Sequence, residues 1–373
     1  MNTKIKLVFF HPYSQLGGAD NSLKRLIENL DHTIYSITLV TLNDSYLKKF
    51  FKKKIIFKKL KAKRAIFSIF ELKKIVNDYT NSAVYKKIIV ISNQNFANII
   101  TSFAIKKNKK VKTIYIDRNH LDELDYSNNF KEKIKKKIIK ILIKYRYSKA
   151  DVVIGICKKL SNDLEKFINR KVKTIYSPAF DKNIIIKSKE KLNLSNKFKY
   201  IINVSRFSRR KDHITTLKAF EIVVRRIKNT KLILIGYGPE IKKIRILAKN
   251  LKISNKVLII NKTYNPYNYM KKSKLLILTS VYEGLANVLI EALTIGTPVI
   301  STNANAGPSE ILLNGKGGDL IEVGDFQNLA KKIINHFKSP NKLNKKTIVA
   351  RKNLKRFDPK VHSEIYSKLF NQI

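Results

Sequence analysis

Two carboxylates eight positions apart, Glu283 and Glu291, are the side chains in this sequence that best suggest chemistry. The apolar run at 275–278 before them has the length and flanks of a buried parallel strand. Glu283 would lie in the loop after this strand, and Glu291 in a helix that ends at Gly296. A second short strand is expected at 298–301. The sequence therefore predicts a βαβ unit, in which small ligands bind at the carboxyl ends of the strands.

The loop between the carboxylates would present backbone N–H groups at the start of the helix. Gly284, Leu285 and Ala286 supply these groups, and the N-terminus of a helix is a favourable place for an anion. A ligand with a central diphosphate and hydroxyl groups at both ends would suit this arrangement, and nucleotide sugars have that shape. Two acids at this spacing are frequent on solvated loops and helices, so the spacing alone does not establish a site.

The segments around the two carboxylates resemble those of GT4-type retaining glycosyltransferases, the family of glycosyl transferases group 1. Matching blocks lie before the carboxylates at 265–271 and after them at 307–312 and 323–325. Further upstream, 203–207 resembles the segment of this family that binds the donor phosphate. The resemblance covers nearly all of 199–330 and extends more weakly to the N-terminus.

The resemblance implies an α/β protein with the GT-B fold, in which two Rossmann-like parallel-sheet domains face an inter-domain cleft. It implies that Arg206 and Lys211 bind the donor diphosphate and stabilise the leaving group. Glu283 would hold hydroxyl groups of the donor sugar, and Glu291 would hold the ribose. Retention of the anomeric configuration follows from the resemblance alone. The donor-binding residues expected on this basis are Gly17, Gly18, Arg206, Lys211, Lys262, Glu283, Gly284, Leu285, Ala286, Asn287 and Glu291.

Two strand ends in the first half of the chain carry further candidates. Gly17 and Gly18 follow the first expected strand, where glycine permits a positive φ and lets the backbone approach a ligand closely. Asp117 and His120 follow the strand expected at 111–116, in a block that by the resemblance faces the cleft. Either side chain could orient the acceptor hydroxyl group, and the sequence does not decide between them. The expected catalytic residues are Glu283, Arg206, Lys211, His120 and Asp117.

The length of 373 residues is sufficient for two domains of ordinary size. We expect a first domain at 1–180, a linker at 181–198, a second domain at 199–357, and a final helix at 358–373 that returns to the first domain.

The single cysteine, Cys157, excludes an internal disulfide. No stretch approaches the roughly 20 apolar residues of a membrane span, and the N-terminus does not resemble a secretory signal. The sequence therefore predicts a cytoplasmic protein.

The formal net charge of +50 is spread over both halves of the chain, and much of it fits a composition rich in lysine throughout. The densest basic segment, 48–64, holds ten Lys or Arg together with Phe50, Phe51 and Phe57. It is either a solvated face or a surface that binds anionic lipid and places the protein on the inner face of the plasma membrane. In the helix expected at 130–147, the apolar stripe is expected to face the core.

We expect no cofactor and no metal, because the sequence has neither a D-x-D triplet nor Cys and His at zinc-binding spacing. The predicted function is metal-independent transfer of a hexose or N-acetylhexosamine from a UDP- or GDP-sugar to a glycan or polyprenyl-linked acceptor. The setting would be synthesis of bacterial surface polysaccharide or lipopolysaccharide. The alternatives are a sugar-nucleotide epimerase of the same fold, a non-catalytic sugar-binding relative, and a basic nucleic-acid-binding protein. Because no nucleic-acid-binding motif is recognisable, we expect no nucleic-acid partner.

Overall fold

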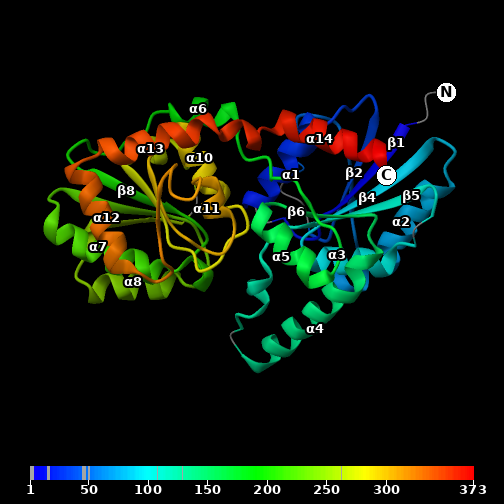
Figure 1. Ribbon diagram of the computed structural model, residues 1–373, viewed down its shortest axis with the longest axis horizontal. Coiled ribbons are helices and arrows are strands. Elements are labelled where there is room, and N and C mark those ends of the chain that lie inside the picture. Colours follow the sequence, from blue (N-terminus) through cyan, green and yellow to red (C-terminus); the bar gives the residue numbers. More distant parts are fainter. Residues whose placement is uncertain are drawn as a thin grey trace. The chain divides into compact units, whose positions relative to one another are not determined.

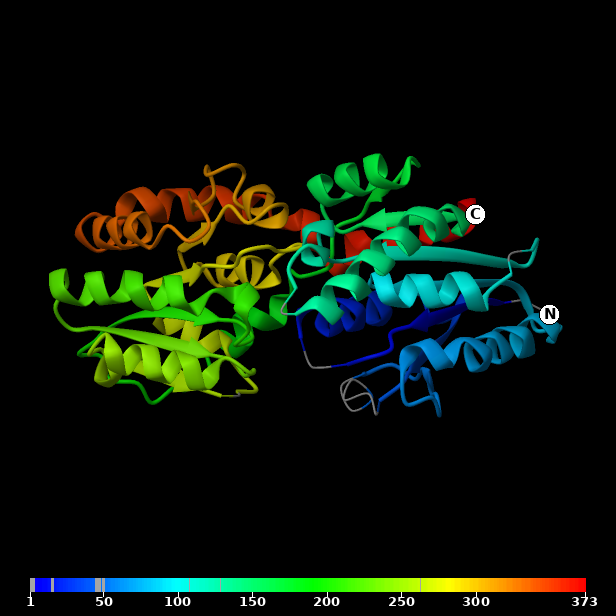
Figure 2. The ribbon, with the colours of Figure 1, turned by 90° about the horizontal axis from the view of Figure 1, so that it is seen from below.

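The computed structural model of the protein describes residues 4–14, 17–43, 48, 51–106, 108–127, 129–261 and 263–373. The chain falls into two compact units: unit 1 comprises Met1–Ala179 and Phe357–Ile373, and unit 2 comprises Phe180–Arg356. Each unit contains a parallel sheet with helices on both faces (Figures 1 and 2). This arrangement confirms the predicted α/β class with two Rossmann-like domains.

The sheet of unit 1 has the strand order β3-β2-β1-β4-β5-β6-β7. Its central strands are nearly continuous runs of buried apolar residues, because helices cover both faces of a parallel sheet. The edge strand β3 lies in the basic segment 48–64 and was not predicted. The strands are β1 (Lys4–Phe10), β2 (Tyr35–Thr41), β3 (Ile56–Lys59), β4 (Tyr85–Asn93), β5 (Val111–Asp117), β6 (Val152–Gly155) and β7 (Lys173–Thr174), and the helices are α1 (Gly18–Asn29), α2 (Ile69–Asn81), α3 (Asn95–Ala104), α4 (Phe130–Arg146), α5 (Lys158–Ile168) and α14 (Pro359–Gln372).

The sheet of unit 2 has the strand order β10-β9-β8-β11-β12-β13. Gly296, with a φ of +92°, ends α10 at the predicted position because glycine adopts the left-handed conformation without strain. The strands are β8 (Lys199–Val204), β9 (Thr230–Ile235), β10 (Val257–Ile260), β11 (Leu275–Leu278), β12 (Val299–Thr302) and β13 (Asp319–Ile321), and the helices are α6 (Lys182–Ser188), α7 (His213–Arg226), α8 (Ile241–Asn250), α9 (Tyr267–Lys272), α10 (Asn287–Ile295), α11 (Gly307–Ile311), α12 (Phe326–Lys338) and α13 (Asn341–Lys352).

The segment predicted as a linker and the final helix each pack within one of the two units. Residues 181–198, predicted as a linker, contain helix α6, which packs against α9 and α10 within unit 2. The final helix α14 belongs to unit 1, where it packs against α1. The rings of Phe370 and Tyr35 meet edge to face there with centroids 5.5 Å apart, and Lys87 Nζ donates to the Phe370 carbonyl at 3.1 Å.

The apolar stripe predicted to lie in the core on α4 is exposed instead. Five side chains form this stripe, and each is between 46% and 75% exposed: Phe130, Ile134, Ile138, Ile141 and Tyr145. A second apolar face of the same helix, formed by Ile139, Leu142 and Ile143, packs into the core of unit 1. The prediction was wrong because the helix has two apolar faces, and spacing does not tell which one meets the sheet. Among the residues that the structure describes, no helix is both long enough and apolar enough to cross a membrane.

Candidate functional site

The topology of unit 2 brings two loops together at one edge of its sheet. Strands β8 and β11 are neighbours, with Ile201 paired to Leu275, and the strand order reverses between them. The loop after β8 carries Arg206 and Lys211, and the loop after β11 carries Glu283. In open parallel sheets, ligands bind outside the carboxyl ends of the strands at such a reversal. The fold therefore joins two sets of predicted site residues that lie far apart in the sequence.

Lys211 and Glu283 form a buried ion pair between these loops. Lys211 Nζ donates to Glu283 Oε1, and Ser280 Oγ donates to the same oxygen at 2.6 Å. Only 9% of Lys211 and 5% of Glu283 is exposed. Since a carboxylate has two acceptor oxygens, Glu283 is oriented through Oε1 and can accept further hydrogen bonds at Oε2.

Burial and charge oppose each other at this pair. Burial lowers the pKa of Lys211 below its ordinary value, although the facing Glu283 carboxylate counteracts part of the shift. Burial acts to raise the pKa of Glu283, but the charges of Lys211 and Arg210 and the hydrogen bonds from Lys211 and Ser280 bring that pKa below its usual value. Glu283 is therefore an ionised carboxylate at neutral pH, and its charge depends on Lys211.

Three glycines allow neighbouring loops to support this site. A Cβ on Gly236 would lie 1.9 Å from the Ser205 carbonyl oxygen, and one on Gly238 would lie 2.2 Å from the Phe207 carbonyl oxygen. A Cβ on Gly307 would lie 2.1 Å from the Gly284 carbonyl oxygen, to which the Gly307 N–H donates at 2.8 Å. Because no side chain fits at these positions, the glycines set the path of the loops that carry Arg206 and Glu283.

Arg206 lies five residues before Lys211 in the same loop, but its side chain, unlike that of Lys211, is exposed. Its guanidinium carbon is 5.9 Å from the centre of the Tyr237 ring. The guanidinium carbon of Arg210, in the same loop, lies 5.6 Å from the centre of the Tyr282 ring, and the Arg210 carbonyl accepts from the Val281 N–H at 2.8 Å. The two loops are thus joined through both backbone and side chains, and Arg206 is a solvent-accessible cation at their surface.

Helix α10 begins directly after the loop that carries Glu283. Its N-cap is Ala286, which has a φ of +47° and no side-chain oxygen to accept from the first turn. Gly284 and Leu285 precede it, so the predicted N–H segment does lead into the helix. Asn287 is the first helical residue. Glu291 lies one turn further along, and only 8% of it is exposed. The remaining donor candidate of unit 2, Lys262, lies outside the described residues.

In unit 1, the loop between β1 and α1 is held by a histidine–aspartate pair that the sequence analysis missed. His11 Nε2 lies 2.7 Å from Asp20 Oδ1, and Asp20 Oδ2 accepts from the Gly17 N–H at 2.8 Å. Gly17 has a φ of −95°, so the expected left-handed conformation is absent there. A Cβ at Gly17 would meet nothing nearer than Asp20 Oδ2 at 4.0 Å. Gly18 is the first residue of α1.

Asp117 ends β5 and lies at the end of a buried hydrogen-bond chain. Tyr147 Oη donates to Asp117 Oδ2 at 3.0 Å, and Asn98 Nδ2 donates to Tyr147 Oη at 2.9 Å. Burial raises the pKa of Asp117 to about 7, and the hydrogen bond from Tyr147 offsets part of this shift. Asp117 is thus a buried acid that is largely protonated below neutral pH.

His120, three residues after Asp117, is held by two acids. Its Nε2 lies 2.7 Å from Asp163 Oδ2, and its Nδ1 lies 3.1 Å from Asp122 Oδ2 and accepts from the Asp122 N–H at 3.3 Å. Asp163 lies on α5 and has a pKa below its ordinary value, because the hydrogen bonds from His120 and Lys159 outweigh the effect of burial. Between the two candidates, Arg118 donates to Asn93 Oδ1 and Ser177 Oγ at 3.1 and 3.0 Å. The sequence gave no signal for these hydrogen-bond partners, because each lies far along the chain from the residue that it contacts or is a single residue without a motif.

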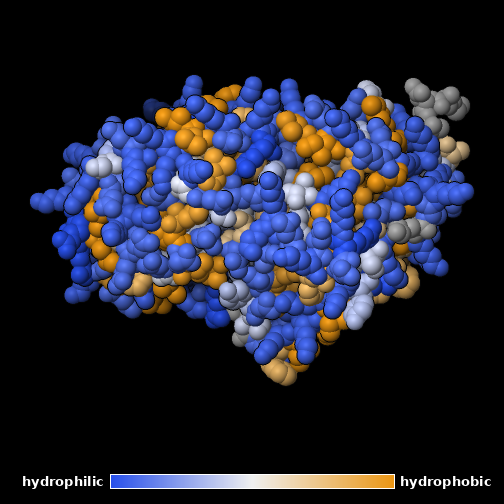
Figure 3. Space-filling model, viewed as in Figure 1, coloured by the Kyte–Doolittle hydropathy of each residue, from blue (hydrophilic) through white to orange (hydrophobic). Residues whose placement is uncertain are grey.

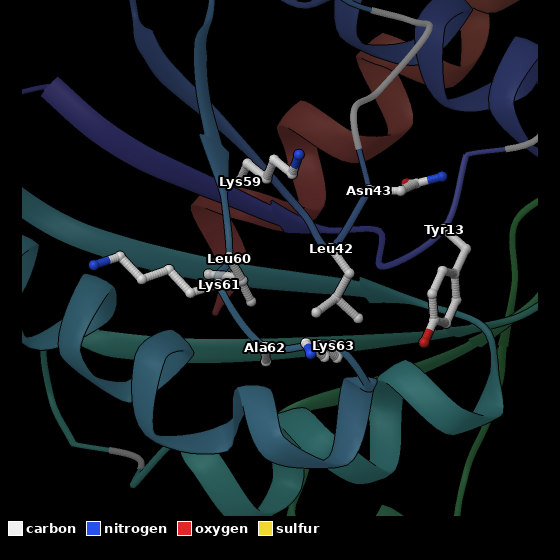
Figure 4. A pocket seen from close by; sticks show the side chains of 8 residues that line it. All are labelled: Tyr13, Leu42, Asn43, Lys59, Leu60, Lys61, Ala62 and Lys63. Carbon is white, nitrogen blue, oxygen red and sulfur yellow. The ribbon is translucent and has the colours of Figure 1, made fainter.

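A cavity of about 400 Å³ lies in unit 1 beside the C-terminal part of the basic segment 48–64 (Figure 4). Tyr13 and Leu42 line one side of it, and residues 59–63 line the other. Figure 4 shows the amino groups of Lys59 and Lys61 extending in different directions instead of converging on one point. The cavity is therefore not built around a single anion.

Comparison with known proteins places these features in context. The family described as glycosyl transferases group 1 matches residues 185–353. The chain is 32% identical over 200 residues to the N-acetylgalactosamine-N,N'-diacetylbacillosaminyl-diphospho-undecaprenol 4-alpha-N-acetylgalactosaminyltransferase of Campylobacter jejuni, with 52% of each chain covered. The chain spans about half the length of the curated relatives it matches.

Two solved structures show the same fold over the whole chain. Sucrose-phosphate synthase of Thermosynechococcus elongatus has a TM-score of 0.83 at 16% identity and covers 99% of both chains. HepE of Anabaena, solved in complex with UDP-glucose, has a TM-score of 0.79 at 18% identity, with 99% of this chain and 100% of that chain covered.

Proposed function

We propose that this protein transfers a sugar from a nucleotide-sugar donor to an acceptor. The match of residues 185–353 to the family of glycosyl transferases group 1 and the GT-B fold of the chain support this proposal. In this reaction, an acceptor hydroxyl oxygen bonds to the anomeric carbon of the donor. The bond from that carbon to the diphosphate oxygen breaks, and the hydroxyl proton is released. The buried Lys211–Glu283 pair supports the proposal most directly, since it offers a cation to phosphate and a carboxylate to sugar hydroxyl groups at one point.

Arg206 and Lys211 have different roles in this proposal. Arg206 is exposed and can present paired N–H donors to the diphosphate as the donor arrives. Lys211 is buried and contributes a fixed positive charge. Charge grows on the diphosphate as the bond to the sugar breaks, so these cations and the N–H groups at the start of α10 stabilise the transition state. We therefore propose a leaving group stabilised by the protein without a catalytic metal ion.

The two carboxylates would bind the two ends of the donor. Glu283 is fixed through Oε1 by Lys211 and Ser280, so hydroxyl groups of the sugar can donate to Oε2. Glu291 would accept from the hydroxyl groups of the ribose. The resemblance to retaining enzymes is the reason to propose transfer with retention of the anomeric configuration.

The names of similar proteins suggest the substrate classes. HepE was solved with UDP-glucose, which favours a UDP-sugar over a GDP-sugar as the first donor to test. The Campylobacter relative is named for an N-acetylhexosamine transfer to a sugar linked to diphospho-undecaprenol. We propose a hexose or N-acetylhexosamine donor and a glycan or polyprenyl-linked acceptor, in bacterial surface polysaccharide or lipopolysaccharide synthesis. Such an acceptor would place the protein in the cytoplasm at the inner face of the membrane.

Unit 1 would then bind the acceptor, and Gly17 and Gly18 would contribute to donor binding, as the resemblance implies. For orienting the acceptor hydroxyl group, we propose His120 in preference to Asp117. The 3.3 Å bond from the Asp122 N–H to His120 Nδ1 is weak, and an acceptor hydroxyl group can replace it. Asp117 already accepts from Tyr147 in a fully buried position.

The test is a donor screen in which UDP- and GDP-sugars are incubated with the protein and a membrane extract, and products are identified by mass spectrometry. We expect one sugar mass to be added to an acceptor and a nucleoside diphosphate to be released. Glu283→Gln should abolish transfer, whereas Glu322→Gln, an exposed acid of unit 2, should leave it unchanged. Conversion of the donor to an isomer without acceptor would indicate the epimerase instead, and no turnover with any donor would contradict the proposal.

A further inference from the structure

Helix α4 of unit 1 presents an apolar stripe to solvent on the side opposite its core contacts. Figure 1 shows α4 along the lower edge of unit 1, and Figure 3 shows hydrophobic atoms among hydrophilic ones over it. On an ideal helix with about 100° per residue, the five exposed apolar side chains fall within a sector of about 80°. The inward face, centred near Ile139, lies on the other side of the helix. The stripe is therefore a second apolar face, which the described part of the chain leaves exposed.

Lysines border this stripe on both sides. By the same helical geometry, two exposed lysines lie along one border and three along the other. These five are Lys131 and Lys135 on one side, and Lys133, Lys137 and Lys144 on the other. The one acid of the helix, Glu132, faces away from the stripe and forms an ion pair with Lys136 at 3.1 Å. The exposed face is thus apolar along its centre and positively charged along its edges.

We propose that this face of α4, defined by the five apolar side chains and the five bordering lysines, docks the protein on a membrane surface that contains anionic lipid. An interfacial helix buries apolar side chains at the boundary between headgroups and acyl chains and keeps its cations among the phosphates. A second copy of the chain would set like charges against each other. A nucleic acid would use the lysines but would gain little from isoleucine side chains, because its recognition relies on phosphate contacts and aromatic stacking.

In the basic segment 48–64, the described residues expose less apolar surface: Ile56 is 44% exposed, and Phe50 lies outside the described residues. The rings of Phe51 and Phe57 pack against each other edge to face, with centroids 5.7 Å apart, and both residues are half-buried. On α4, by contrast, Phe130 is 75% exposed and Tyr145 is 67% exposed. Among the described residues of these two surfaces, α4 offers the more complete combination of apolar and basic groups. This inference does not depend on the proposed enzymatic activity.

Binding is measured by co-sedimentation of the full chain with vesicles of phosphatidylcholine alone and with added phosphatidylglycerol. Changing the five bordering lysines to Gln should weaken binding to anionic vesicles by at least about 100-fold, since each contributes on the order of 1 kcal/mol near the surface and 1.4 kcal/mol is tenfold. Changing Ile134, Ile138 and Ile141 to Ser should weaken it by at least about tenfold. All these side chains are exposed, so the variants should fold, which thermal unfolding would verify.

Matched controls in unit 2 separate a local surface from total charge. The charge control changes five exposed helical lysines to Gln: Lys242, Lys249, Lys331, Lys342 and Lys345. The apolar control changes three exposed isoleucines to Ser: Ile186, Ile246 and Ile348. Both controls should bind as the wild type does. Equal loss in the charge control would overturn the proposal, because attraction would then follow net charge.

A fluorescent reporter tests insertion directly, because the sequence contains no tryptophan. Tyr145→Trp places a single tryptophan in the stripe, and Tyr264→Trp places one at an 85% exposed position of unit 2. Anionic vesicles should shift the emission of the first to shorter wavelength and leave the second unchanged. No binding by the wild type, or no shift at position 145, would refute docking of this face on lipid. Full binding by the Ile→Ser variant, with loss in the Lys→Gln variant, would also overturn the proposal, because attraction to headgroup charge alone would then account for the binding.

Discussion

The ion pair between Lys211 and Glu283 predicts a specific loss of stability when Lys211 is changed to Met. The substitution removes the cation and leaves Glu283 buried, with the Ser280 hydroxyl as its remaining hydrogen-bond donor and the Arg210 charge nearby. Removing one partner of a buried pair typically costs 3–5 kcal/mol. Because Ser280 and Arg210 remain, we expect about 3 kcal/mol, the lower end of that range.

The pH dependence of this loss identifies its cause. In the wild type, the pKa of Glu283 lies below its ordinary value, so the stability that the pair contributes is lost as pH falls through that pKa. In Lys211→Met, burial would dominate and raise the pKa of Glu283 above its unfolded value of about 4.3. The variant is then penalised above about pH 4.3, where unfolding releases a proton. The difference in stability between wild type and variant should therefore be large at pH 7 and should shrink below about pH 4.

Hydrogen–deuterium exchange of peptides from β11 and α10 measures this difference within unit 2, without assuming that both units unfold together. Adding Glu283→Gln to Lys211→Met should restore more than half of the lost stability, because it removes the unpaired charge. The matched control is Lys218→Met, an exposed position on α7, which should change little. If Lys211→Met were as stable as the wild type at pH 7, or if its deficit were unchanged at pH 4, the pair would not be a buried ionic contact.

Three further predictions concern the donor, the metal and the first unit. Glu291→Ala should chiefly raise the donor KM, since ribose contacts hold equally in ground and transition states, and steady-state kinetics with normal folding would show it. Turnover should persist in EDTA, and a complete loss that Mg²⁺ or Mn²⁺ restores would contradict the proposed metal-free leaving-group stabilisation. Because Asp117 has a pKa raised to about 7, unit 1 should lose up to about 4 kcal/mol of stability between pH 4 and pH 7; Asp117→Asn should remove this loss, as exchange of β5 peptides would report.

The local elements of the site could be predicted from the sequence. The apolar run before Glu283, followed by helical spacing and by Gly296, gave β11, α10 and β12 to within about two residues. A buried strand and a glycine-terminated helix are set by nearby residues, so local pattern was sufficient. The resemblance to a known family then indicated the two-sheet architecture, which no local pattern could supply.

Contacts between distant residues could not be predicted in this way. Lys211 and Glu283 are 72 positions apart and meet only because the strand order of the sheet reverses between β8 and β11. The pairing of His11 with Asp20 likewise depends on how α1 packs after β1. On α4, two apolar faces compete for the core, and the choice is made by the surface of the sheet and its neighbouring helices. Helix α6 was missed because it has only seven residues, and its three apolar residues are consecutive instead of recurring at helical spacing.

The central claim is that the carboxyl edge of β8 and β11 binds a nucleotide sugar, and calorimetric titration of UDP and GDP tests it without knowledge of sugar or acceptor. We expect one of the two nucleotides to bind the wild type, with affinity reduced at least about tenfold in Arg206→Ala, since the charge-assisted bonds to phosphate are lost. Arg245→Ala, an exposed arginine of α8 in the same unit, should bind as the wild type does. Failure of both nucleotides to bind the wild type, or equal affinity in Arg206→Ala, would contradict the assignment of this edge as the donor site.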